Sequence, residues 1–178
     1  MRLFFGLSLP DDVRHACSAC SLAAQRTIDA RYSLPSNYHI TLCFLGEVPQ
    51  ECLPDAAQIL KSIVRRFPAP SVSLGPCDYF GRTQNGVLII RAVSSPALEP
   101  LHDALAAALE QAGLPHDPGP FSPHVTLARH ARIGENPLPP VPPLSFTPMQ
   151  AYLFLSARNS GNVLTYTPLF SADFASGL

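Results

Sequence analysis

Charged residues are scarce in this 178-residue sequence and make up only 14% of it, whereas about 25% is typical of globular domains. Twelve basic and thirteen acidic residues leave a formal net charge of −1. Proteins that bind long nucleic acids by bulk electrostatics carry a strongly basic surface, so the composition argues against that class. It does not exclude a site for one terminal phosphate, because such a site needs only a few local donors.

Long hydrophobic runs are also absent, since no apolar stretch approaches the ~18 residues of a membrane span. The cysteines number five, an odd count, and nothing ahead of them resembles a secretory signal. We therefore expect a reduced, cytoplasmic protein that does not enter a membrane. Cys17 and Cys20 have the C-x-x-C spacing of some metal and redox sites, but no second pair completes a zinc site. Both fall on the apolar face of a predicted helix, and we interpret them as core residues.

The sequence is rich in hydrophobic residues, which make up 47% of it, so a packed interior is expected. Its length suits one sizeable domain or two small lobes that share a core. Hydrophobic periodicity predicts an alternation of short strands with three helices, in which antiparallel pairing dominates, and the fold class is therefore α+β. The predicted strands cover 3–7, 39–46, 72–80, 87–93, 121–130, 150–157 and 163–170, and the predicted helices cover 13–24, 53–64 and 96–112.

Local signals set some of the predicted boundaries. Ser95 can cap the third helix, Pro96 suits its first position, and Gly113 can close it. The dipeptide Asn85-Gly86 predicts the turn of a hairpin. Prolines crowd the stretch 137–148, which therefore predicts an ordered loop or a sheet edge rather than continuous regular structure.

The pattern His-x-Thr-Leu occurs twice, at His39 and at His124, about half the chain length apart. Alternate residues of a strand share a face, so each histidine should point the same way as the threonine two positions later, Thr41 or Thr126. The spacing of the two copies predicts a duplicated, two-lobed architecture with one motif in each lobe. We expect the two His-Thr pairs to converge on one groove.

Two imidazoles and two hydroxyls suit the cleavage of a phosphodiester. A neutral histidine can take a proton from water while a protonated one gives a proton to the leaving oxygen, and both states are accessible around the usual pKa of ~6.5. Threonine hydroxyls can donate to the phosphate oxygens, where charge builds up. A metal site is the alternative use of these histidines, but no carboxylate or thiolate stands at ligand spacing, so neither a metal nor a cofactor is expected. The other histidines lack such a pattern: His15 and His102 are expected to face solvent on helices, and His116 to lie in a surface loop. His130 follows Arg129 and could border the groove, but nothing in the sequence requires it.

The sequence around these histidines resembles the two-histidine (2H) phosphoesterases, in particular the bacterial RNA 2′,3′-cyclic phosphodiesterases, also called 2′-5′ RNA ligase-like proteins. The resemblance follows the family order and covers nearly the whole chain. It implies a bilobal fold with two antiparallel sheets flanking a central groove, helices on the outside, and a single domain over 1–178 with two pseudo-symmetric lobes. The segments that carry it are LFFGLSLP at 3–10, HITLCFLGE at 39–47, PFSPHVTLAR at 120–129 and YTPL at 166–169.

The resemblance also implies an activity, which is the metal-independent hydrolysis of 2′,3′-cyclic phosphates, on RNA 3′ ends or nucleotides, to 2′-phosphates. His39 would be the general acid that protonates the leaving 3′ oxygen, and His124 the general base that activates water. Thr41 and Thr126 would hold the phosphate. Two alternatives stay open, namely 2′-5′ RNA ligation by the same groups and a non-catalytic protein that binds RNA ends or nucleotides. A monomer is the expected state.

At two further positions, the family analogy and the alternation of side chains along a strand predict opposite orientations. Family members place the arginine matching Arg129 near the phosphate and the phenylalanine matching Phe44 near the base. Strict alternation from His124 and His39 puts both side chains on the opposite, core-facing side. Either each strand ends or bulges before that point, or the two residues are structural. Core packing is the structural alternative for Phe44, whereas an arginine that faced the core would need a partner.

Overall fold

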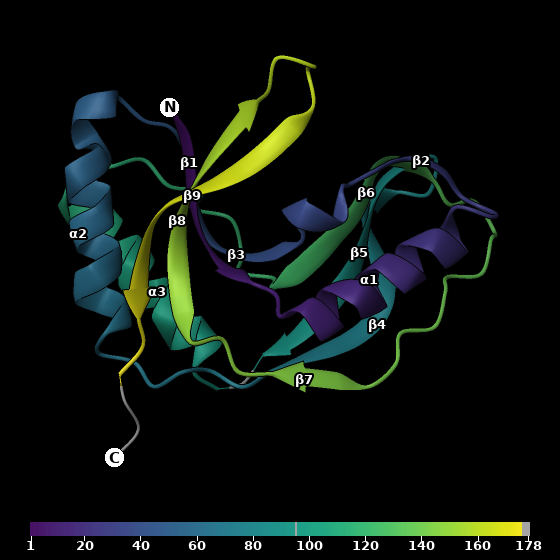
Figure 1. Cartoon of the computed structure of the whole chain (residues 1–178), viewed down its shortest axis with the longest axis horizontal. Coiled ribbons are helices and arrows are strands. Elements are labelled where there is room, and N and C mark those ends of the chain that lie inside the picture. The colour runs from purple at the N-terminus through teal and green to yellow at the C-terminus, as the bar shows by residue number, and fades with distance from the viewer. Residues whose placement is uncertain (95, 176–178) are drawn as a thin grey trace.

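Three helices and nine strands are found in the computed structural model, which describes residues 1–94 and 96–175 (Figure 1). All pairings between these strands are antiparallel, and the helices lie on the outside, so the predicted α+β class is confirmed. The elements are β1 (Arg2–Ser8), α1 (Asp11–Ala24), β2 (Asp29–Tyr32), η1 (Pro35–Asn37), β3 (His39–Glu47), η2 (Gln50–Cys52), α2 (Leu53–Val64), β4 (Val72–Arg82), β5 (Asn85–Ser94), α3 (Leu98–Gln111), β6 (His124–Arg132), β7 (Leu144–Phe146), β8 (Gln150–Arg158) and β9 (Leu164–Asp173).

The strands form one curled sheet in the order β7-β4-β5-β6-β3-β1-β8-β9, with β2 paired to β6 outside this path (Figure 1). Its two halves, β7-β4-β5-β6 and β3-β1-β8-β9, meet where β3 pairs with β6. Within the described residues this junction consists of one register pair, Ile40 with Val125. The two separate sheets implied by the family resemblance are therefore connected into one. The residues of the junction directly follow His39 and His124, so the sheet places the two motifs side by side.

The helices divide unequally between the two halves. α2 packs against β8, β9 and α3, and α3 also contacts β3, whereas α1 contacts β6 and β7 on the other half (Figure 1). In the part of the chain that the structure describes, no helix is long and apolar enough to cross a membrane. Most of the buried side chains in the described residues belong to one hydrophobic cluster, which includes Leu3, Leu7, Cys17, Cys20, Ile40, Leu101 and Val125. Cys17 and Cys20 are thus core residues of α1, as predicted.

Local sequence signals predict the end of the third helix but not its start. It begins at Leu98, after Pro96 has taken a turn conformation, and so starts later than predicted. The proposed cap Ser95 lies outside the described residues. Gly113 closes the helix as predicted, with a φ of +68° that other residues rarely adopt. The β4–β5 turn comes two residues earlier than the Asn85-Gly86 dipeptide predicts, since Arg82 already pairs with Asn85.

Two short strands lie outside the predicted strands. The proline-rich stretch holds only β7, three residues at the edge of the sheet, which agrees with the predicted loop or sheet edge because half of its residues cannot donate to a ladder. The sequence does not predict β2, because two of its four residues, Asp29 and Arg31, are exposed and charged and leave no apolar pattern. This strand nevertheless matters for the site, since it extends the sheet beside the second motif strand.

Candidate active site

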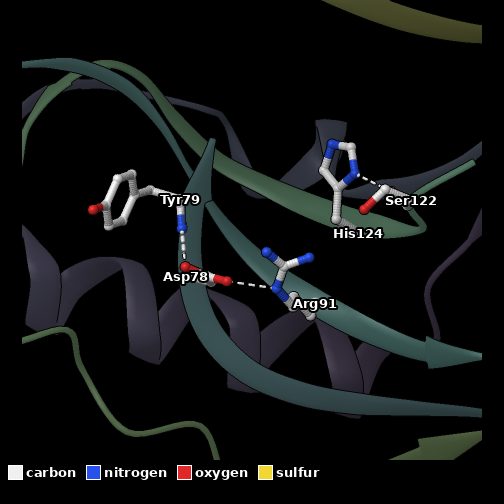
Figure 2. A network of polar contacts seen from close by, with 5 residues as sticks. All are labelled: Asp78, Tyr79, Arg91, Ser122 and His124. Atoms are coloured by element: carbon white, nitrogen blue, oxygen red, sulfur yellow. Dashed lines mark hydrogen bonds and ion pairs between the residues drawn. The ribbon is translucent and has the colours of Figure 1, made fainter. Parts of the chain in front are cut away.

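The two motif histidines begin β3 and β6 and are held in the same way. The Nδ1 of His39 donates to the carbonyl oxygen of Asn37 at 2.7 Å, and the Nδ1 of His124 donates to that of Ser122 at 2.7 Å (Figure 2). A carbonyl can only accept, so both rings carry a proton on Nδ1, and the neutral rings keep Nε2 unprotonated for chemistry. The Nε2 of His39 lies 3.1 Å from the hydroxyl oxygen of Thr41. Each motif therefore presents a basic nitrogen in a fixed orientation.

Each motif strand bulges twice, and the first bulge, which decides the orientation of the residues that follow it, is an extra residue three positions after the histidine. It is Leu42 in β3, opposite β1, and Leu127 in β6, opposite β5. A bulge shifts the alternation of faces by one residue. Phe44 and Arg129, five positions after their histidines, therefore reach the groove side of the sheet. Of the alternatives left open by the sequence, the structure therefore has the bulge, and strict alternation does not apply to these two side chains.

The backbone carbonyls of these two bulge residues accept hydrogen bonds from two different donors. The Nδ1 of His102 donates to the carbonyl of Leu42 at 2.7 Å, and the backbone N–H of Ser33 donates to that of Leu127 at 2.8 Å. The ring of His102 also stacks on Phe121, with centroids 4.4 Å apart. The expectation that His102 faces solvent is therefore wrong, since this residue supports the bulge that turns a side chain into the groove.

A groove of about 750 Å³ lies between the two motifs and gathers all six sequence-predicted site residues. Its other lining residues come from β1, β2, β4, β5, β8 and β9 and from the loop before β6. Within the described residues, no group of three or more His, Cys, Asp or Glu side chains is placed to hold a metal ion. The predicted residues in the lining are His39, Thr41, Phe44, His124, Thr126 and Arg129.

The lining of this groove is cationic, although the whole chain has a net charge of −1. Four arginines line it against a single carboxylate, Asp117, among the residues that the structure describes. The groove is therefore suited to an anionic ligand. The four are Arg2, Arg31, Arg129 and Arg158.

The two histidines differ in their surroundings. The ring of His39 packs against both Phe4 and Tyr166, at centroid distances of 4.7 and 4.8 Å, and Tyr166 meets it edge-on. His124 has one such neighbour, Phe80, at 4.9 Å and also edge-on. His39 is therefore the more enclosed of the two imidazoles.

Both imidazoles are held neutral. Burial lowers the pKa of His39 to about 4, the hydrogen bond to Asn37 acts in the opposite direction, and the charges of His124 and Arg129 lower it further. The pKa of His124 is also lowered, first by burial and then by the charges of Arg129 and Arg91, against the effect of its hydrogen bond to Ser122. An anion bound between the two rings would favour their protonated forms.

Arg91 adds a difference between the motifs that sequence reasoning missed. It lies directly across from His124 in the β5–β6 register, whereas the corresponding neighbour of His39 is Ser8. Figure 2 shows Arg91 held by Asp78, with its Nε donating to a carboxylate oxygen at 2.5 Å. The backbone N–H of Tyr79 and Arg91 together keep the pKa of Asp78 below its usual value. A fixed positive charge thus stands beside one of the two histidines.

The depressed pKa of His39 predicts a pH-dependent stability. The unfolded chain binds a proton on this residue between about pH 6.5 and 4 that the folded chain does not, so stability falls as the pH is lowered through this window. The shift corresponds to about 3 kcal/mol at the acidic end. We expect His39→Gln to remove this part of the pH dependence. Urea unfolding of both proteins near neutrality and near pH 4 measures it, and equal pH slopes would contradict the burial of a neutral His39.

Comparison with known proteins agrees with the geometry. Residues 10–135, most of the chain, match the model of the 2′-5′ RNA ligase superfamily. The chain belongs to this superfamily. The 2H phosphoesterase resemblance drawn from the two His-x-Thr segments is therefore confirmed.

Curated relatives and solved structures match the chain over nearly its whole length. The RNA 2′,3′-cyclic phosphodiesterase of Thermus thermophilus is 28% identical over 96% of this chain and 90% of the relative. The Escherichia coli protein of the same name is 28% identical over 94% and 93%. A crystal structure of a Thermus thermophilus protein superposes with a TM-score of 0.78 at 29% identity, covering 98% of both chains. Escherichia coli LigT complexed with 3′-AMP superposes with a TM-score of 0.76 at 26% identity and the same coverage.

Proposed function

We propose that the groove hydrolyses 2′,3′-cyclic phosphates on RNA 3′ ends or nucleotides to 2′-phosphates, using two histidines as acid and base and no metal ion. The observation that carries this proposal is the convergence of His39, Thr41, His124 and Thr126 on one cationic groove. Both histidines use Nδ1 to anchor themselves, which leaves Nε2 for proton transfer. Relatives that carry this activity in their name match the chain over nearly its full length.

The proposed reaction uses each group once. Thr41, Thr126 and Arg129 donate to the non-bridging oxygens of the cyclic phosphate and stabilise the charge that develops on them. His124 takes a proton from water through Nε2 as the water oxygen forms a bond to phosphorus. The bond from phosphorus to the 3′ oxygen breaks, and His39 gives a proton to that oxygen. The products are a 2′-phosphate and a free 3′ hydroxyl.

The charges around the two rings bear on this division of roles. A bound phosphate would neutralise Arg129, whose charge lowers the pKa of both histidines, and would add a negative charge beside both rings. The pKa of His39, about 4 in the free protein, must rise in this way for the residue to act as the acid. Substrate binding would therefore favour the protonated form of His39, which the general acid requires. His124 has the additional cation Arg91 next to it, which favours the neutral form required of a base.

The remaining predicted contact is Phe44, to which we assign stacking of the nucleobase next to the scissile phosphate. Its ring faces the groove beyond the bulge, and the guanidinium of Arg2 lies 4.8 Å from its centroid. Aromatic–base stacking contributes about 1–3 kcal/mol per base.

The proposal extends to the architecture. We assign the two halves of the sheet to two pseudo-symmetric lobes of one domain over 1–178. Their motif strands bulge at the same offset, and both histidines bond to the carbonyl two residues earlier. Because a single chain supplies both motifs, we propose that the monomer is the active unit.

Product analysis tests the activity. Incubated with adenosine 2′,3′-cyclic phosphate and EDTA, the protein should form adenosine 2′-phosphate at the rate seen without chelator, because both proton transfers come from side chains. In parallel, tRNA half-molecules should be joined more slowly than the cyclic phosphate is opened. A rate that disappears in EDTA and returns with added metal contradicts the metal-free mechanism. Joining without hydrolysis would favour ligation, and binding without turnover would favour the non-catalytic alternative.

Arg129→Gln tests the phosphate contact. A charge-assisted hydrogen bond is worth about 1.5–3 kcal/mol, so we expect kcat/KM to fall by about 10- to 100-fold. The acidic limb of the pH profile should also move upward, since the charge of Arg129 lowers the pKa of both histidines. Arg132→Gln is the matched control, because this arginine lies on the same strand, is exposed and pairs with Asp29 at 3.7 Å. Equal kinetics of the two variants would remove Arg129 from the site.

A further inference from the structure

A second pocket of about 250 Å³ opens from the catalytic groove between the β2–η1 segment and the β8–β9 hairpin. It shares His39, Thr126 and Arg129 with the groove, so it begins at the site of the chemistry. Phe44 and Asp117 line the groove but not this pocket. The pocket therefore extends the site in a direction different from the end at which we place the nucleobase.

Two arginines line both the pocket and the groove. They are Arg31 of β2 and Arg158 of β8. The Nη1 of Arg158 donates to the carbonyl of Asn162 at 2.7 Å, which fixes the guanidinium across the hairpin turn. In the described parts of the chain, 1–94 and 96–175, neither arginine forms an ion pair with a carboxylate. Two cations thus lie at one end of the site without an acidic partner among the described residues.

One residue, Asn37, fixes the part of β9 that lines both this pocket and the catalytic groove. The side-chain amide of Asn37 donates to the carbonyl of Leu164 at 2.8 Å and accepts from the backbone N–H of Tyr166 at 3.3 Å. The backbone carbonyl of Asn37 also holds the ring of His39. The β9 wall of the pocket and the catalytic imidazole are therefore connected through one short element, η1.

We propose that this pocket binds the phosphate carried on the 5′ oxygen of the nucleoside whose cyclic phosphate is opened. The inference rests on the proposed function. With the cyclic phosphate between His39 and His124 and the base towards Phe44, the 5′ oxygen is the remaining substituted position of the ribose. In an RNA end it carries the next phosphodiester, one ribose away from the reacting phosphorus. Arg31 and Arg158 supply the bidentate, charged donors that a phosphate prefers.

The substrate class follows from this assignment. The site should prefer RNA ends, and nucleotides with a 5′-phosphate, over nucleoside 2′,3′-cyclic phosphates that end in a 5′ hydroxyl. Because the interaction is between charges near the surface, the preference should weaken as ionic strength rises.

Calorimetric binding of two product-like ligands tests the pocket without requiring turnover. Adenosine 2′,5′-bisphosphate should bind about tenfold more tightly than adenosine 2′-phosphate. In Arg31→Gln and Arg158→Gln this ratio should approach one, whereas Arg132→Gln should keep it. Equal affinities in the unaltered protein, or a ratio that both pocket variants retain, would overturn the proposal.

Turnover provides the second arm and separates the two possible sources of the phosphate. A dinucleotide ending in a 2′,3′-cyclic phosphate should be cleaved about tenfold more efficiently than adenosine 2′,3′-cyclic phosphate, and so should adenosine 2′,3′-cyclic phosphate carrying a 5′-phosphate. A dinucleotide with a neutral methylphosphonate linkage should lose the advantage, and an advantage kept by that compound would contradict recognition of charge. Loss of all hydrolysis together with an intact calorimetric preference would overturn the proposed function and not the pocket.

Discussion

His124→Ala should lower kcat on adenosine 2′,3′-cyclic phosphate by about 10²- to 10⁴-fold, the usual contribution of a positioned acid or base. His39→Ala should have an effect of the same size. The reason is that each ring is fixed by a backbone carbonyl and presents Nε2 to a site where water and a leaving oxygen must exchange protons. Initial rates under saturating substrate measure the effect.

The folded state should survive these changes, because both side chains lie at the start of their strands and line a groove rather than the core. Circular dichroism and thermal unfolding check this. His130→Ala is the matched control, since His130 lies on the same strand as His124, is exposed and bonds to Asn85 outside the groove. Full activity in His124→Ala, or an equal loss in His130→Ala, would contradict the two-histidine mechanism.

Replacing the bridging 3′ oxygen of the substrate by sulfur should separate the acid from the base. A thiolate leaves without protonation far more readily than an alkoxide, because a thiol has a pKa of only ~8.5. His39→Ala should therefore lower kcat by about 10²- to 10⁴-fold on the oxygen substrate, but by less than about tenfold on the sulfur substrate. His124→Ala should lose activity equally on both, since water must still be activated.

The opposite pattern, in which the sulfur substrate rescues His124→Ala and not His39→Ala, would exchange the two roles. The experiment is decisive because the motifs are so alike in local geometry. What separates them is their surroundings, with two aromatic rings around His39 and the cation Arg91 beside His124. Neither difference can be read from the motif sequence alone.

The sequence was sufficient to predict those features of the fold that depend on the periodicity of apolar residues. Alternation of apolar residues located the motif strands, the helical spacing placed Cys17 and Cys20 in the core, and Gly113 marked the end of α3. The repeat of His-x-Thr at half-chain spacing predicted a shared groove because strand geometry fixes which side chains point together.

The sequence left open whether the motif strands bulge before Phe44 and Arg129, and only the structure decides it. A single extra residue in a strand leaves no trace in the hydrophobic pattern, since Leu42 and Leu127 are both apolar. Its consequence is large, because it turns Phe44 and Arg129 towards the groove. The support for the bulges comes from His102 and Ser33, whose partners are set by tertiary packing and not by sequence neighbours.

The positive charge of the groove is a second property that the composition of the whole chain does not reveal. A net charge of −1 argues against bulk binding of nucleic acid. The curled sheet nevertheless gathers Arg2, Arg31, Arg129 and Arg158 from four strands onto one surface. Only the pairing of strands distant in sequence brings these arginines together.

The central claim is that the two His-x-Thr segments form one phosphate site. A crystal structure of the protein with adenosine 2′-phosphate tests it most directly. The phosphate should lie within hydrogen-bonding distance of the Nε2 atoms of His39 and His124 and of the hydroxyls of Thr41 and Thr126. A phosphate bound by one motif alone, with the other histidine turned away from it, would contradict the account.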